Sequence, residues 1–276
     1  MRLVIASLVA IVSGHAALAA DAPPFSPVDI MPGSPSYFDW SGVYFGGQIG
    51  YASATIDPAN ASASHTGYIL RNTVLEAEAH VSQWTNLPAT TSEGQSYGGF
   101  IGYNSQWDDV ILGVEINYNR GALSGDAQGS IARNFTASDS YLYSVSVASQ
   151  ASVNIIDYAT ARFRAGYIMG RFLPYMMAGF AVGRADITRA TTVTFSAVDS
   201  DPTTAPDLPP IPSTTQSLSD SKKGALIYGF DVGAGVDVAI TPNIFVRAEY
   251  EYIQFTQFQG ITAGINTGKV GIGLKF

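Results

Sequence analysis

Ten charged side chains between Glu115 and Lys275 fall on one face of alternating segments, five of each sign. The set comprises Glu115, Arg162, Arg164, Asp231, Asp237, Arg247, Glu249, Glu251, Lys269 and Lys275. Opposite charges that share a space away from water pair with one another, because an unpaired charge there is costly. The pattern therefore predicts a buried salt-bridge network, and the chemistry of this network is structural.

Two of these carboxylates suggest a second interpretation. Glu249 and Glu251 lie on one face of a predicted strand, where they could act as the carboxylate pair of a glycosidase. Arg247 stands beside them on the same face and favours a structural salt bridge. We expect no enzymatic activity from this chain.

The histidines offer weak candidates for haem or metal binding. His65 and His80 lie in one long polar segment, with Glu76 and Glu78 close to the second histidine. No nucleophile and no metal-ligand spacing accompanies them. The simpler interpretation is that both are solvated loop residues, so we expect no cofactor and no metal site.

The first residues have the features of a secretory signal peptide. Arg2 gives a positive start, Leu3 to Val12 is apolar but too short to span a bilayer, and Ala17-Leu18-Ala19 offers a cleavage site. We predict a signal peptide over residues 1–20. A proline-rich periplasmic leader is expected over residues 21–39, because five prolines interrupt any periodicity there.

Composition excludes several classes of protein. Asp and Glu number 22 against 14 Lys and Arg, which argues against nucleic acid as a partner. Cysteine is absent, so the chain has neither disulfides nor thiolate metal ligands. Hydrophobic residues make up 46% of the chain but are dispersed. Dispersed apolar content suits a transmembrane β-barrel, in which alternate residues face lipid.

From Trp40 onward, segments of period 2 indicate eight strands. The predicted strands cover residues 41–54, 95–106, 109–120, 153–169, 172–184, 223–239, 243–255 and 266–276. Tight turns alternate with predicted loops at residues 55–94, 121–152, 185–222 and 256–265. Short turns at one end and long loops at the other are typical of an outer-membrane barrel with periplasmic turns and extracellular loops. A soluble β-sandwich, the alternative, has no reason to keep this asymmetry.

The predicted strands carry an ordered set of short motifs that resembles a known family. The motifs are Trp40–Gly47, Gly102–Asn104, Gly113–Glu115, Thr160–Tyr167, Leu173–Tyr175, Gly233–Val236, Ala248–Tyr250 and Lys275–Phe276. The set is similar to the small eight-stranded outer-membrane proteins of alphaproteobacteria, which include major surface antigens and haemin-binding, porin-like proteins. Phe100 departs from that pattern, because the family tends to have a polar lumen residue there.

The resemblance implies an all-β barrel domain over residues 40–276 in the outer membrane of a Gram-negative cell. It implies as partners the outer-membrane lipid and lipopolysaccharide, the barrel insertion machinery, and haemin or host surface molecules. Phe276 would be the assembly signal that the insertion machinery reads. An eight-stranded lumen is only wide enough for side chains, so we expect the charges to plug it. The protein would then have a structural or surface-interaction role, and a small-solute channel or a haemin receptor is the alternative.

Overall fold

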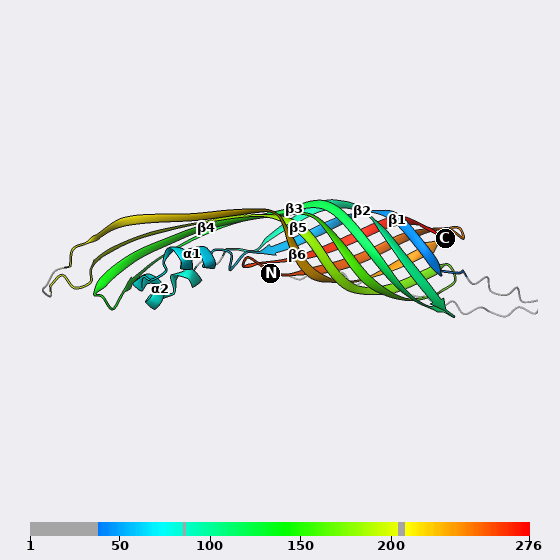
Figure 1. Ribbon diagram of the computed structural model, residues 1–276, viewed down its shortest axis with the longest axis horizontal. Helices are drawn as coiled ribbons and strands as arrows, with labels where there is room; N and C mark the ends of the chain where they lie inside the picture. The colour runs from blue at the N-terminus through cyan, green and yellow to red at the C-terminus, as the bar shows by residue number, and fades with distance from the viewer. Residues whose placement is uncertain (1–37, 85–86, 204–207) are drawn as a thin grey trace, which may run out of the picture. The chain divides into compact units, whose positions relative to one another are not determined.

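The segments of alternating apolar and polar residues form eight antiparallel strands, which close into a barrel (Figure 1). The computed structural model describes residues 38–84, 87–203 and 208–276. Each strand pairs with its neighbours along the chain, and β1 pairs with β8. The strands are β1 Gly42–Asp57, β2 Thr90–Trp107, β3 Val110–Thr136, β4 Tyr141–Tyr167, β5 Phe172–Asp199, β6 Ile211–Ala239, β7 Ile244–Phe258 and β8 Ile261–Lys275. The predicted signal peptide lies outside the described residues, as does the predicted leader up to residue 37.

The predicted facing of the barrel strands is confirmed. In β3, the side chains of Val114 and Ile116 are 49% and 60% exposed on the outside, whereas Glu115 between them is 2% exposed. In β5, whose facing the pattern left open, Phe180 is outside and Tyr175 is inside. Alternate side chains of each strand therefore face the lipid, and those between them face the lumen.

Three tight turns join the strands at one end of the barrel, here called the turn end. Asp108 and Gly170 have positive φ angles of 49° and 64° within two of these turns. The third turn connects β6 to β7 through residues 240–243. The opposite end, where residues 58–89 connect β1 to β2, is called the loop end.

Three of the four predicted long loops are wrong. The predicted loop at 256–265 is a two-residue turn between β7 and β8, and residues 121–152 and 185–222 are largely strand. There β3, β4, β5 and β6 continue as two long hairpins past the point where they pair with β2 and β7. Residues 123–136, 141–155, 185–199 and 211–225 form a four-stranded sheet that we call the sheet extension. Residues 137–140 connect the strands of the first hairpin, and residues 200–210 connect those of the second.

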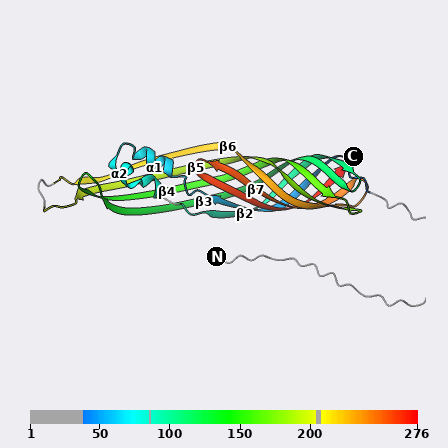
Figure 2. The same ribbon diagram turned by 90° about the horizontal axis from the view of Figure 1, so that it is seen from below.

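Helices cover one face of the sheet extension. The connection between β1 and β2 contains α1 Ala63–Ile69, α2 Val74–Ala79 and the 3-10 helix η1 Val81–Gln83. Figures 1 and 2 place α1 and α2 beside the four extended strands. Leu75 of α2 and Val81 pack with Val145, Val147 and Val193 of the sheet. None of the described helices is long and apolar enough to cross a membrane.

Register shifts mark the junction between barrel and sheet extension. The pairing of β3 with β4 shifts between Arg120 and Leu123, and that of β4 with β5 shifts between Ile155 and Asp157. The pairing of β5 with β6 shifts between Ala185 and Ile187. Such bulges add one residue to one strand and locally increase the twist. The set of β4 residues that faces inward therefore changes from even to odd numbers across the junction.

Candidate functional site

The lumen is filled in three layers. At the turn end, buried aromatic and aliphatic side chains form an apolar layer of Trp40, Tyr44, Phe100, Ile111, Ile168, Leu173, Ala239 and Phe245. At the loop end, a second apolar cluster draws on every strand except β2 and includes Ile56, Leu123, Ile155, Ile227, Phe255 and Ile265. The charged residues lie between these two layers. The sequence pattern predicted the charged layer and missed both apolar ones.

Arg162 of β4 is the hub of the charged layer. Its guanidinium contacts three carboxylates: Glu115 of β3 at 2.5 Å, Glu249 of β7 at 2.8 Å and Glu251 of β7 at 3.0 Å. The side chains of all four residues are fully buried. Lys269 of β8 completes this half of the layer, with its Nζ 2.9 Å from Glu249 and 2.7 Å from Glu251.

Two further arginines form the other half. Arg164 lies 3.0 Å from Glu115 and 2.7 Å from Asp237. Arg247 contacts the same two carboxylates, each at 2.8 Å. Glu115 is therefore shared by all three arginines, and the network links β3, β4, β6, β7 and β8 across the barrel. Each of these paired charges has at least two partners of opposite sign, which offsets the cost of removing it from water.

Aromatic residues support the network from the turn end. The hydroxyl of Tyr44 donates to Glu115 at 2.8 Å, and that of Tyr175 donates to Glu249 at 3.0 Å. The guanidinium of Arg164 lies 3.8 Å from the ring centre of Tyr175, and that of Arg247 lies 4.0 Å from that of Phe100. Phe100, the residue that departs from the family pattern, thus offers its ring face to a cation.

Two of the ten predicted residues stand apart from the eight that pair. Asp231 is fully buried in the lumen, but neither of its carboxylate oxygens has a hydrogen-bond partner among the described residues. Lys275 does not join the network, which corrects the prediction for that residue. Its Nζ lies 3.9 Å from Asp39 and donates to the carbonyl of Ser41 at 3.2 Å, at the turn end. Lys275 is the last residue of β8 and lies at the rim of the barrel.

A second cluster ties the helices to the sheet extension. Arg189 of β5 donates to Asp220 of β6 at 2.6 Å and to the carbonyls of Ala61 and Gln259 at 3.2 and 3.0 Å. The Nε2 of His65 in α1 lies 3.4 Å from the same aspartate. Ala61 lies in the connection between β1 and β2, and Gln259 lies in the turn between β7 and β8. Arg189 therefore joins these two connections. We call Arg189, Asp220 and His65 the clasp.

Burial determines the protonation of the clasp histidine. Removal from water, with the charge of Arg189 as the second cause, lowers the pKa of His65 below its usual value. The hydrogen bond from Arg189 lowers the pKa of Asp220. His65 is therefore a buried packing residue and is not the solvated loop residue that the sequence suggested.

The other haem or metal candidates are used locally. His80 is exposed and ends α2 in a left-handed conformation, with φ at 48°. The carboxylate of Glu76 accepts from the hydroxyl of Ser82 at 2.6 Å, and that of Glu78 accepts from the backbone N–H of Ser138 at 3.0 Å. No group of three or more metal-ligating side chains occurs in the described part of the chain.

The last residue pairs with the first strand. The N–H of Phe276 donates to the carbonyl of Val43 at 2.9 Å, and its ring stacks on that of Phe45 with 5.5 Å between centres. The Phe276 side chain is 70% exposed on the outside of the barrel, at the turn end. This position is open to the membrane interface.

Sequence comparisons place the barrel among known proteins. The family model described as "Outer membrane protein beta-barrel domain" matches residues 7–276. The 22 kDa outer membrane protein of Rhizobium leguminosarum bv. viciae is 27% identical over 195 residues, which are 65% of this chain and 66% of that protein. The 25 kDa outer-membrane immunogenic protein of Brucella ovis is 25% identical, over 99% of this chain and 97% of the relative.

Among solved structures, Neisserial surface protein A is similar, with 14% identity and a TM-score of 0.35 over 86% of this chain and 98% of that one. The family match covers nearly the whole chain, including every strand and every charged residue of the lumen. The closed ring of eight strands and the apolar belt outside it agree with that match. The chain therefore belongs to the outer membrane protein β-barrel family and is a protein of the outer membrane.

Proposed function

We propose that this protein is a closed, non-enzymatic barrel that anchors a rigid surface structure in the outer membrane. The observation that carries the proposal is the filled lumen. The side chains that pair in the charged layer are at most 1% exposed, and an apolar layer lies on either side of them. In this function the turn end and the leader face the periplasm, and the sheet extension with its helices stands outside the cell.

The alternatives fit these contacts less well. A small-solute channel needs a continuous polar path, and both ends of this lumen are blocked by packed apolar side chains. A haemin receptor needs an accessible axial ligand, and His65 is buried in the clasp. His80 is accessible, but its neighbours Glu76 and Glu78 are engaged in other hydrogen bonds. An anchor needs no path through the lumen, so the anchoring role is compatible with the packing of all three layers.

Conductance across planar bilayers tests the closed barrel. We expect the refolded protein to give no current steps above the leak of the bilayer. Stable steps from the wild-type chain, in a preparation that is folded by its heat-dependent gel mobility, would overturn the proposal.

A charge-neutral pair of substitutions tests whether the charged layer alone closes the lumen. Arg162→Ala with Glu115→Ala removes two large side chains from the centre of the charged layer and leaves three of its paired charges of each sign. We expect no current from this variant, because the apolar layers at both ends of the lumen remain. A leak from it, but not from the control Phe163→Ala on the outside of the same strand, would show that the charged layer alone closes the lumen.

A further inference from the structure

The outer face of β3–β6 changes its chemistry at one row of residues. Below the row, towards the turn end, large apolar side chains such as Phe163, Phe180 and Phe230 face outwards. The row itself contains the ion pair of Arg184 with Asp157, whose carboxylate also accepts from the hydroxyl of Tyr118 at 3.0 Å. Tyrosines and charged residues at such a level mark the edge of the hydrocarbon.

Above this row, the same face becomes small and polar. The outward positions of residues 124–134, 144–154, 186–196 and 215–221 contain only Ser, Thr, Asn, Gln, Ala and Asp. One transverse row is Ser130, Ala148, Thr192 and Ser217. At about 3.3 Å per residue and 4.8 Å between strands, this surface is roughly 33 Å long and 14 Å wide. We call it the polar face.

The polar face is nearly free of charge and can form many hydrogen bonds. Its two charged residues, Asp126 and Asp186, lie in the rows nearest the hydrocarbon. The hydroxyls of Thr192 and Ser217 lie 2.9 Å apart and those of Thr194 and Thr215 lie 3.0 Å apart, so they hold one another in position. Each hydroxyl keeps further capacity for an external partner.

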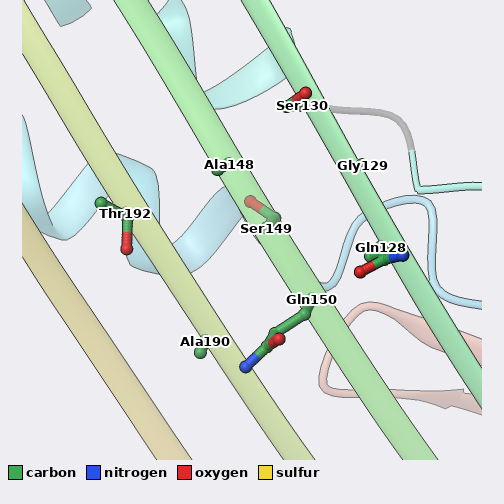
Figure 3. Close-up of a pocket in the computed structure, with 8 residues that line it drawn as sticks. All are labelled: Gln128, Gly129, Ser130, Ala148, Ser149, Gln150, Ala190 and Thr192. Carbon is green, nitrogen blue, oxygen red and sulfur yellow. The ribbon is translucent and has the colours of Figure 1, made fainter.

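The centre of the polar face is hollowed. Small residues at Ala148 and Ala190 leave a shallow cavity of about 510 Å³ whose lining includes Gln128, Gln150 and Thr192. Figure 3 shows the two glutamine side chains and the threonine hydroxyl around these alanines, on three neighbouring strands. Two amides and a hydroxyl around such a hollow match the hydrogen-bonding groups of a sugar ring.

We propose that the polar face binds the saccharide chains of lipopolysaccharide molecules in the surrounding outer leaflet. The polar face continues the lipid-contacting surface of the barrel on the same four strands. It therefore borders the layer of the membrane that lies directly above the acyl chains. In the outer leaflet, that is the saccharide part of lipopolysaccharide. Because the lipid is confined to the same membrane, its effective concentration is high and weak hydrogen bonds suffice.

The chemistry of the polar face argues against other occupants. Hydrocarbon would leave its hydroxyls and amides without partners. Stable protein partners are usually bound through aromatic and arginine side chains, and the polar face contains neither. A polyanion would need cations, and the charges present are the two aspartates. A neutral, hydroxyl-rich chain is the partner that satisfies these groups.

Amide hydrogen exchange of the full chain in vesicles tests the proposal. One vesicle preparation contains lipopolysaccharide with its complete saccharide chain, and the other contains lipid A alone. With the complete chain, we expect about fivefold slower exchange in residues 124–134, 144–154 and 188–196, as two weak hydrogen bonds would give. The variant Gln128→Ala with Gln150→Ala should lose this protection. Gln83→Ala with Gln216→Ala, two exposed glutamines off the polar face, should keep it.

Each other outcome overturns the proposal. Equal exchange in both preparations would mean that saccharides do not bind. Protection in lipid A vesicles that grows with protein density would identify a second copy of this chain as the occupant. Equal protection by soluble polysaccharide, added at the same bulk concentration to phospholipid vesicles, would show a free glycan ligand and remove the role of the shared leaflet.

Discussion

The same four strands bury opposite kinds of side chain in the barrel and in the sheet extension. Within the ring, β3–β6 turn charged residues such as Arg162 inwards and apolar residues such as Phe163 outwards. Beyond the bulges, Val145 and Val147 face inwards under the helices, whereas Ser144 and Gln150 face outwards. The comparison teaches that the surrounding solvent decides which face is apolar. Lipid requires an apolar outer face, and water requires a polar one.

Removing the hub of the charged layer should have the largest effect. Arg162→Met leaves Glu115, Glu249 and Glu251 with fewer partners in a space without water, and we expect a loss of about 3–5 kcal/mol in the free energy of unfolding. Urea unfolding in vesicles measures it. Asp231→Asn, which breaks no ion pair, is the matched control and should cost much less. Equal losses would mean that pairing is not what stabilises the layer.

Matched arginine substitutions on β4 test the inversion directly. Ala161 and Ala148 are both small and exposed on the outer face, one in the barrel and one in the sheet extension. Ala161→Arg should cost about 2–4 kcal/mol, because it places a cation against lipid. Ala148→Arg should leave the unfolding free energy nearly unchanged. The comparison fails if the two variants unfold at the same urea concentration.

Loss of the terminal residue should have a smaller effect, and on assembly. Deleting Phe276 removes the stacking on Phe45 and the aromatic end of β8, so we expect less folded protein in the membrane. The ratio of unboiled to boiled bands on a gel gives the folded fraction. Substitution to Tyr keeps an aromatic ring and serves as the control. Unchanged amounts after the deletion would count against Phe276 as an assembly signal.

Acidification should loosen the clasp, the smallest of these effects. The pKa of His65 is lowered in the folded protein, so the undocked state binds the proton more readily. Stability of the docked α1 is therefore present above about pH 6.5, the ordinary histidine value, and decreases as the pH falls below it. Hydrogen exchange of α1 between pH 7.5 and 5.5 measures this. In His65→Asn the pH dependence should disappear, and its persistence would assign the effect to another group.

Period 2 in the sequence predicted the barrel strands and failed for the sheet extension. In β3, Leu112, Val114 and Ile116 alternate with polar or small residues, so one face is plainly apolar. Beyond residue 121 the alternation continues, as in Val145 and Val147 against Ser144 and Ser146, but the dense Ser and Thr of the outer face resemble a hydrated loop. The helices that cover those apolar residues come from a distant segment, and local pattern cannot reveal such a contact.

The part of the candidate site that could be predicted from the sequence is the set of charged residues in the lumen. Eight of the ten predicted residues pair in the lumen, because a charge at the depth of the hydrocarbon is costly on the outer face of a barrel strand. The pattern also placed Tyr44 on the inner face, but its bond to Glu115 depends on the tilt of β1 relative to β3. The two apolar layers were missed for the same reason, since they form only when strands from the whole ring converge.

The bulges at the junction make the two long hairpins separable from the barrel. Below them, the register is held by the ring, whereas above them β3 pairs only with β4 at one edge and β6 only with β5 at the other. A hairpin can therefore be lengthened or shortened by matched pairs of residues in its two strands without moving any residue in the ring. The height to which this protein rises above the membrane is thus a freely variable dimension, open to change while the anchor is inherited intact.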